Sequence, residues 1–231
     1  MAKTGFHQSS LTKKYIMALA GLFLIIFLFV HLAINLLVLL KGSENYEARE
    51  LFNISAHFMG TNILIKVFEV VLFGGFIIHI LYGLILQIQN WMARPGRYKK
   101  ENYSFTSPFS KFMIHTGILV LIFLVIHLND FYFIAKFSDT LDKVYYHGEA
   151  YPDLGLLVIE KFHIPWYVVF NIVMFLLLGF HLHHAFQSGF QSMGWQHPKY
   201  SPAVRSISLW ISIILTAGFI FIPLMIYFGN Y

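Results

Sequence analysis

Cysteine is absent from this chain of 231 residues. Without thiols the protein has no disulfide bond, no iron–sulfur cluster on its own thiolates and no thiol nucleophile. Charge is scarce too, because 12% of the residues are charged against about 25% in an average soluble domain. The formal net charge of +5 is spread over short segments between apolar runs, so nucleic acid is not a predicted partner. Potential metal ligands, in contrast, are abundant as twelve histidines.

Apolar residues make up 58% of the sequence and gather in five long runs. Because about 20 such residues cross the hydrocarbon core of a bilayer, each run is long enough to span it. We therefore predict an all-α integral membrane protein, with a single membrane domain over residues 1–231. Its predicted transmembrane helices cover about residues 15–40, 62–91, 110–136, 164–192 and 203–228. The polar segment 41–61 is partly amphipathic, which predicts a helix near the membrane surface.

Lysine and arginine are distributed unevenly between the two sides of these spans. With the N-terminus in the cytoplasm, ten basic residues fall on the cytoplasmic side and six on the other. The positive-inside rule therefore predicts a cytoplasmic N-terminus and a C-terminus on the outer side. The same orientation puts ten of the eleven acidic residues outside.

The first and third spans contain an internal repeat. Residues 21–32 read GLFLIIFLFVHL and residues 117–128 read GILVLIFLVIHL, with glycine and histidine at the same offsets. A parallel repeat of this kind predicts a four-helix bundle with a pseudo-twofold axis along the membrane normal, accompanied by a fifth helix. The alternative is chance similarity between two apolar helices.

Each of the first four spans carries a histidine at membrane depth, where an ionisable side chain marks a functional site by default. These residues are His31, His79, His127 and one of His181, His183 and His184. At 1.5 Å per residue, His31 and His127 lie about 25 Å beyond the basic residues that begin their spans. His79 and His181 lie only about 9–12 Å from the same side. The first two histidines thus share an outer level and the other two an inner level.

Two facing imidazoles at each of two levels, about 13–15 Å apart along the bundle, are the ligands that two b-type haems need. Three other interpretations remain open. A membrane histidine can simply donate a hydrogen bond to a neighbouring helix, zinc prefers ligands clustered at one level, and a proton relay usually includes carboxylates at mid-depth. Glu69 and Asp130, however, lie near the outer ends of their predicted helices.

Two features of the inner level depend on particular residues: which histidine is the fourth ligand, and which glycines leave room for a porphyrin. Depth leaves open whether His181 or His184 is the ligand, since both lie on one helix face, and the repeat favours His181. Gly21 lies near the inner level and offers a close approach of a porphyrin to the backbone, as do Gly74, Gly75 and Gly117.

The chain resembles a known family over nearly its whole length. The resemblance rests on the order and spacing of QSSLTKKYIMALAGLFL, HLAIN, ELFNISAHFMG, IIHILYGLIL, VIHLND and GFHLHHAFQSGFQSMGW. These segments are similar to the single-chain, five-helix, di-haem cytochrome b anchor of succinate dehydrogenases and fumarate reductases, of the cytochrome b558 type. The final segment also favours His181, because Gly-Trp follows that histidine by thirteen residues.

The resemblance implies two haem b groups. His79 and His181 would hold the inner haem beside an iron–sulfur subunit, and His31 with His127 would hold the outer one. A flavoprotein subunit with FAD would interconvert succinate and fumarate. The chain itself would pass electrons to or from a membrane quinone, menaquinone, in the bacterial inner membrane.

The sequence contains no specific motif for a quinone site or a proton pathway. We place a quinone site near the outer haem by hypothesis, with His57, Asn53 and Glu50 as candidate groups. The alternative is that these three residues only cap a surface helix. Some di-haem fumarate reductases carry a glutamate two residues before the fourth ligand, and because Gly179 stands there we infer no proton pathway from it.

Two other functions are consistent with the pattern. The first is a di-haem cytochrome b subunit of another membrane oxidoreductase, of the hydrogenase or formate dehydrogenase type. The second is a haem-free transporter in which the histidines move protons or bind a metal. Haem content distinguishes the transporter, and the partner subunits distinguish the two cytochromes.

Overall fold

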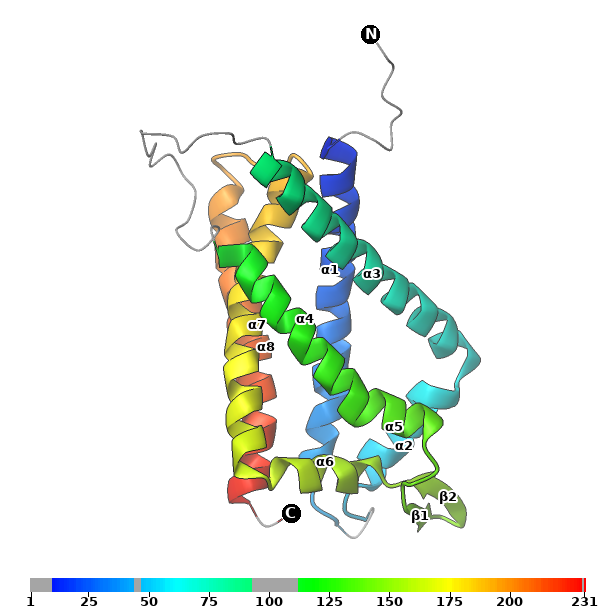
Figure 1. Cartoon of the computed structure of the whole chain (residues 1–231). Helices are drawn as coiled ribbons and strands as arrows, with labels where there is room; N and C mark the ends of the chain where they lie inside the picture. Colours follow the sequence, from blue (N-terminus) through cyan, green and yellow to red (C-terminus); the bar gives the residue numbers. More distant parts are fainter. Residues whose placement is uncertain (1–9, 44–46, 93–111, 230) are drawn as a thin grey trace.

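Five long apolar helices run between the two ends of the molecule (Figure 1). The computed structural model describes residues 10–43, 47–92, 112–229 and 231. The long helices are α1 (Ser10–Leu36, extended by the 3₁₀ turn η2, Leu37–Leu39), α3 (Ile63–Met92), α4 (Met113–His127, extended by η4, Leu128–Tyr132, and α5, Phe133–Phe137), α7 (Pro165–Ser192) and α8 (Ser201–Phe228). Each is long and apolar enough to cross a membrane, so the prediction of five such helices is confirmed. Residues 1–9 and 93–111, which hold several of the basic residues assigned to the cytoplasmic side, lie outside the described residues.

These segments are helical because their apolar composition suits the hydrocarbon of a bilayer. A backbone surrounded by hydrocarbon must satisfy its N–H and C=O groups internally, which a helix does and an isolated strand does not. Pro165 stands in the first turn of α7, where its missing N–H removes no helical hydrogen bond.

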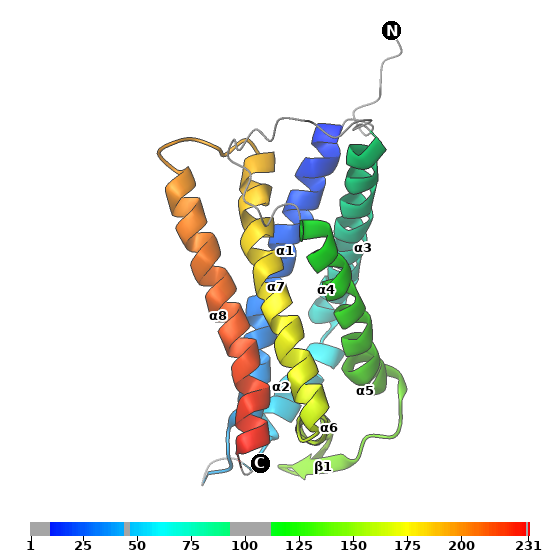
Figure 2. The ribbon, with the colours of Figure 1, turned by 60° about the vertical axis from the view of Figure 1, so that its left-hand side comes forward.

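Four of the long helices contact one another in a ring. α1 contacts α3 and α7, and α4 contacts the same two helices on the other side. α8 packs against α7 and α1, as Figure 2 shows from the side. Buried side chains from these last three helices form the centre of the hydrophobic core: Leu32, Phe175, Leu215, Phe219 and Ile222.

Shorter elements cover the end of the molecule that holds the C-terminus (Figure 1). They are the helices α2 (Glu50–Thr61) and α6 (Leu154–Phe162) and the antiparallel strands β1 (Lys143–Tyr146) and β2 (Glu149–Pro152). The helix expected within 41–61 is present as α2. The hairpin and α6 fall between the third and fourth predicted spans, where the sequence analysis predicts no helix or strand. Asp153, which joins the hairpin to α6, accepts hydrogen bonds from Arg49 and Asn53, about a hundred positions away, and no local pattern reveals these contacts.

A π-helical turn, η4, follows His127 directly. It carries Asp130, whose carboxylate accepts hydrogen bonds from Lys161 Nζ at 3.1 Å and from the Tyr167 hydroxyl at 2.8 Å. A π turn inserts one extra residue into a helix and is frequent at functional sites. Here it ties the end of the third span that follows His127, which is the predicted outer end, to α6 and α7.

Candidate cofactor site: two histidine pairs

His31 on α1 and His127 on α4 face each other toward the end of the molecule that carries α2 and α6. Their ring centroids are 5.7 Å apart and the ring planes are inclined by 84°. Aromatic rings enclose the pair, because Phe27 stacks on His31 at 5.2 Å and Phe131 lies 5.2 Å from His127. The backbone carbonyl of His31 accepts a hydrogen bond from Asn35 Nδ2 at 2.8 Å.

His79 on α3 and His181 on α7 form a second pair of the same kind. Their ring centroids are 6.3 Å apart and the planes are inclined by 81°. The structure thus brings together the four histidines that the depth argument paired, in the same two combinations.

Each inner histidine lies against a glycine of the repeat. A Cβ added to Gly21 would be 3.1 Å from Cε1 and 3.2 Å from Nδ1 of His79. A Cβ added to Gly117 would be 3.4 Å from Cε1 of His181. The repeat therefore supplies, on both α1 and α4, a glycine for the inner level and a histidine for the outer level.

The distance between the two levels follows from this arrangement. Gly21 and His31 are ten residues apart on α1, as are Gly117 and His127 on α4. At 1.5 Å per residue the two pairs are separated by about 15 Å along these helices. Among the described helices, each pair also joins members that are opposite rather than adjacent in the ring, α1 with α4 and α3 with α7.

The Nδ1 atoms of the inner pair have partners on the neighbouring helices. His79 Nδ1 lies 3.4 Å from the carbonyl oxygen of Met17, and His181 Nδ1 lies 3.4 Å from Oγ1 of Thr116. A carbonyl oxygen can only accept, so the contact with Met17 favours a proton on Nδ1 of His79 and leaves its Nε2 unprotonated, which is the form that binds a metal.

The geometry of both pairs fits an iron held between two imidazoles. Two nitrogens with metal bonds of about 2 Å on opposite sides of a metal are about 4 Å apart, and each ring centre lies about 1 Å further back. The expected separation of ring centres is therefore about 6 Å, between the 5.7 Å of the outer pair and the 6.3 Å of the inner pair. In the part of the chain that the structure describes, no group of three or more histidine or carboxylate side chains is placed to hold a metal, so the tetrahedral zinc alternative gains no ligand set.

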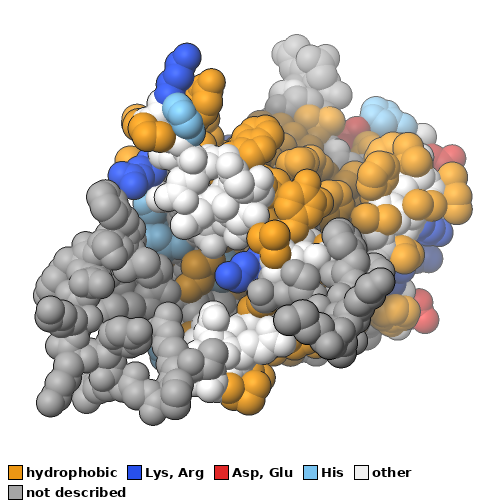
Figure 3. All heavy atoms as spheres, turned by 90° about the horizontal axis from the view of Figure 1, so that it is seen from above, with side chains coloured by type: hydrophobic (Ala, Val, Ile, Leu, Met, Phe, Trp, Pro, Cys, Tyr) orange, Lys and Arg blue, Asp and Glu red, His pale blue; other side chains and the backbone are white. Residues whose placement is uncertain are grey.

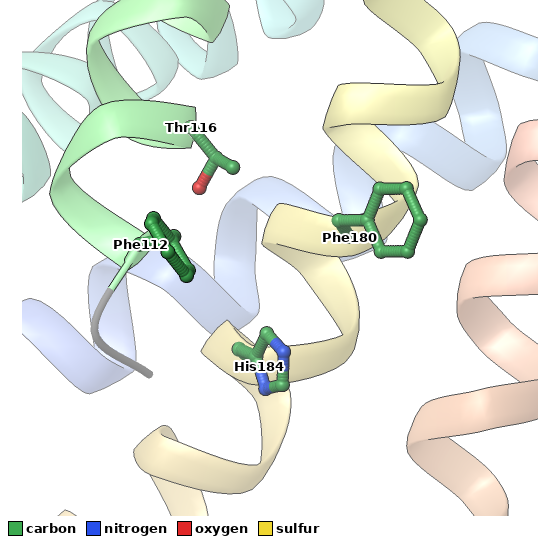
Figure 4. Close-up of a pocket in the computed structure, with 4 residues that line it drawn as sticks. All are labelled: Phe112, Thr116, Phe180 and His184. Atoms are coloured by element: carbon green, nitrogen blue, oxygen red, sulfur yellow. The ribbon is translucent and has the colours of Figure 1, made fainter. Parts of the chain in front are cut away.

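His183 and His184 are placed differently from His181. Oγ of Ser208 on α8 lies 2.9 Å from His183 Nδ1 and donates a hydrogen bond to the His183 carbonyl at 2.5 Å, which ties α7 to α8. His184 lines a small, mainly apolar cavity of about 150 Å³ beside Thr116 (Figure 4). The ring that faces His79 is that of His181.

Two of the three quinone candidates belong to a polar network at the outer end. Asn53, which is 1% exposed, donates a hydrogen bond to Asp153 at 2.9 Å and accepts one from the backbone of Gly155 at 2.8 Å. Glu50 accepts hydrogen bonds from the Glu47 backbone N–H and from His147, each at 2.7 Å. The Glu47 N–H and, to a smaller extent, His147 lower the pKa of Glu50 despite its burial, which keeps it a carboxylate and makes it a weaker proton acceptor.

His57 remains accessible. It lies on the exposed face of α2, and its ring packs edge-on against Tyr151 of the hairpin at 5.3 Å. Of the three candidates, His57 is exposed, whereas Glu50 and Asn53 are buried.

The two carboxylates in the predicted spans, Glu69 and Asp130, each form an ion pair with a lysine and accept a hydrogen bond from a tyrosine hydroxyl. Glu69 is bound by Lys136 Nζ at 2.9 Å and receives a short hydrogen bond from the Tyr132 hydroxyl. Asp130 is bound by Lys161 and Tyr167 as described above. Both carboxylates belong to the end of the molecule with α6, which agrees with their expected place near the outer ends of the helices.

The position of the glutamate found in some fumarate reductases has no room for a side chain. A Cβ on Gly179 would clash with the hydroxyl of Thr216 on α8. Thr216 Oγ1 is buried and has no hydrogen-bond partner among the residues that the structure describes. Close packing of α7 on α8 thus takes the space that a carboxylate would need.

The opposite end of the molecule carries basic side chains. Figure 3 looks down on this end, where Lys and Arg side chains appear among hydrophobic ones. The described basic residues nearest to the helix ends here are Lys13, Lys14, Lys199 and Arg205.

Comparison with known proteins gives no relative to set beside this geometry. No protein-family model matches the chain, and no significantly similar curated protein or solved structure is found.

Proposed function

We propose that this protein is the di-haem cytochrome b anchor of a succinate:quinone oxidoreductase. In this role it carries electrons between an iron–sulfur subunit on the cytoplasmic face of the bacterial inner membrane and a quinone, menaquinone, in the bilayer. The chemistry of succinate and fumarate belongs to a flavoprotein subunit with covalent FAD. The proposal extends to fumarate reductase, because both directions use the same parts.

The observation that carries this proposal is the two facing histidine pairs about 15 Å apart. α1, α3, α4 and α7 supply one ligand each, and the pairs cross the ring of helices on its two diagonals. This supports a four-helix haem-binding bundle with α8 as the fifth helix. A single structural histidine needs one hydrogen-bond partner, and that requirement does not explain four imidazoles in two matched pairs.

The residues of the chain have separate roles in this proposal. His79 and His181 bind the inner iron and His31 and His127 the outer iron, each through Nε2. Gly21 and Gly117 leave room at the inner level, and the phenylalanines around His31 and His127 exclude water from the outer level. Haem held by two histidines supplies one-electron transfer and leaves no open position on the iron for oxygen.

The test is a spectrum of the purified membrane complex, reduced with dithionite minus oxidised, combined with a pyridine haemochrome count. We expect two b-type haems per chain, low-spin and unreactive with carbon monoxide. A properly assembled sample without haem would refute the proposal and leave the histidines as a proton or metal path.

The identity of the complex needs a second measurement. We expect a flavoprotein with covalent FAD and an iron–sulfur subunit to co-purify with the chain and to give succinate:quinone activity. Two haems with hydrogenase or formate dehydrogenase subunits in their place would assign the chain to the alternative class of cytochrome.

A further inference from the structure

The two halves of the repeat hold the inner histidines in different ways. Adding the same offset to each residue of the first half relates Met17 to Met113, Ala20 to Thr116 and Gly21 to Gly117. In the first half the carbonyl oxygen of Met17 lies directly at His79 Nδ1. In the second half a side chain absent from the first half, Thr116, stands at His181 Nδ1.

The Thr116 hydroxyl has a defined direction. It donates its proton to the carbonyl oxygen of Met113 at 3.0 Å. A hydroxyl has one proton, so its contact with His181 must use a lone pair of Oγ1 as the acceptor. His181 Nδ1 is therefore the donor, and the order of the chain is His181 Nδ1–H to Thr116 Oγ1–H to Met113 C=O.

This short chain of hydrogen bonds has a chemical consequence for His181. A hydroxyl that already donates to a carbonyl becomes a better acceptor, because hydrogen bonds in a chain polarise one another. A better acceptor at Nδ1 raises the basicity of the imidazole at Nε2 and holds the ring in one orientation. Gly117, the next residue, leaves the ring close to the backbone of α4.

We propose that Thr116 is a positioning residue that orients His181 and lowers the reduction potential of the inner haem through the hydrogen bond it accepts from His181 Nδ1. This inference rests on the proposed function, since it requires His181 to be an iron ligand. A more basic ligand stabilises the oxidised iron more than the reduced iron, which sets the direction of the effect.

The test compares three variants of Thr116 in the assembled complex. Thr116→Val keeps the shape and removes the hydroxyl, Thr116→Ser keeps the hydroxyl, and Thr116→Ala reproduces the residue of the first half. Ala20→Val is the control, because it puts the same valine side chain at the equivalent position, where the histidine partner is a backbone carbonyl. The readouts are the midpoint potential of each haem from a redox titration and the g-values of the oxidised haems by electron paramagnetic resonance.

We expect Thr116→Val and Thr116→Ala to shift the reduction equilibrium of the inner haem about tenfold toward the reduced form, which is about 59 mV for one electron. Its g-values should change with the freed ring. Thr116→Ser should restore both, while Ala20→Val should leave both haems unchanged. Loss of the inner haem in Thr116→Val with retention in Thr116→Ser supports the same role.

Two results would overturn the inference. One is an unchanged potential and unchanged g-values in Thr116→Val, and the other is an equal shift in Thr116→Ser, which would assign the effect to bulk rather than to the hydroxyl. Both leave the two haems in place, so they differ from failure of the proposed function, in which the wild-type complex has no haem to titrate.

Discussion

At the scale of single residues, four imidazoles and two glycines define the candidate site. The histidines meet across the ring of helices in pairs, and Gly21 and Gly117 each allow an inner histidine to lie against a helix backbone. Their roles differ. Substituting a histidine removes a candidate ligand, whereas substituting a glycine only changes the space beside a ligand.

The two pairs predict a split in the effects of histidine substitution. His79→Ala or His181→Ala should lose the inner haem and weaken assembly with the partner subunits, because the proposed function places the inner site toward those subunits. His31→Ala or His127→Ala should lose the outer haem and leave docking largely intact. Haemochrome counts and co-purification of the partner subunits measure these outcomes, and two bis-histidine haems in any of the four variants would contradict the ligand assignment.

Gly21 predicts a steric effect on the inner site. In Gly21→Val the new Cβ would lie 3.1 Å from His79 Cε1, so the ring must move before iron can bind. We expect haem affinity at the inner site to fall about tenfold, within the range for changes beside metal ligands. Gly83→Val is the matched control, since a Cβ at Gly83 on α3 makes only an ordinary contact, 3.9 Å from Met17 Sδ. Equal haem loss in both variants would show that the helices, and not the ring of His79, are disturbed.

At the scale of elements, the polar network of the outer end joins α2 to the hairpin and α6. The Asp153 carboxylate accepts hydrogen bonds from Arg49 at 3.0 and 3.2 Å, from Asn53 at 2.9 Å and from the Leu156 backbone N–H at 3.0 Å. Burial acts to raise the pKa of Asp153, but the hydrogen bonds from Arg49, Asn53 and Leu156 outweigh it and hold the pKa below its usual value.

Asp153→Asn should therefore loosen the outer end without affecting the haems. Hydrogen bonds to a charged group contribute about 1.5–3 kcal/mol, so we expect α6 to open about 2 kcal/mol more easily. Hydrogen exchange of the α6 amides measures this opening. Glu149→Gln is the control, because Glu149 is an exposed carboxylate on β2.

The same network sets a pH dependence with a definite sign. Because the folded pKa of Asp153 is lowered, its stabilisation is complete above the unfolded value of about 4 and is lost as the pH falls through the folded value. The protection of the α6 amides, which is their exchange rate relative to the intrinsic rate at each pH, should fall in acid in the wild type and depend less on pH in Asp153→Asn. Identical acid profiles of the two proteins would contradict this account.

The elements also divide according to what sequence can reveal. Long apolar runs predict the five helices, because a segment must be long enough to cross the bilayer and must satisfy its own backbone hydrogen bonds there. The repeat with His31 and His127 indicates which histidines share a level. The network around Asp153 has no such signal, since its partners Arg49 and Asn53 are about a hundred residues away and no periodicity links them. For the same reason, the hydrogen bonds that engage Asn53 and Glu50 appear only in the folded chain.

At the scale of the whole molecule, the two ends differ in structure and in predicted environment. One end carries α2, the hairpin and α6, and the other carries the start of α1 and the turn between α7 and α8 (Figure 1). The distribution of lysine and arginine predicts that the second end faces the cytoplasm. In the proposed function, this orientation decides which end binds the iron–sulfur subunit and which histidine pair lies nearer to it.

The absence of cysteine makes this orientation directly testable. Tyr145→Cys on β1 and Trp195→Cys in the α7–α8 turn form a matched pair, because each native side chain is 66% exposed and aromatic. In spheroplasts, a membrane-impermeant maleimide should label Tyr145→Cys and not Trp195→Cys, and both should react after permeabilisation. The wild-type chain, with no thiol of its own, gives the background. The reverse labelling pattern would place the inner histidine pair next to the outer face. An iron–sulfur subunit in the cytoplasm would then meet His31 and His127 first, and the proposed order of the two haems would be inverted.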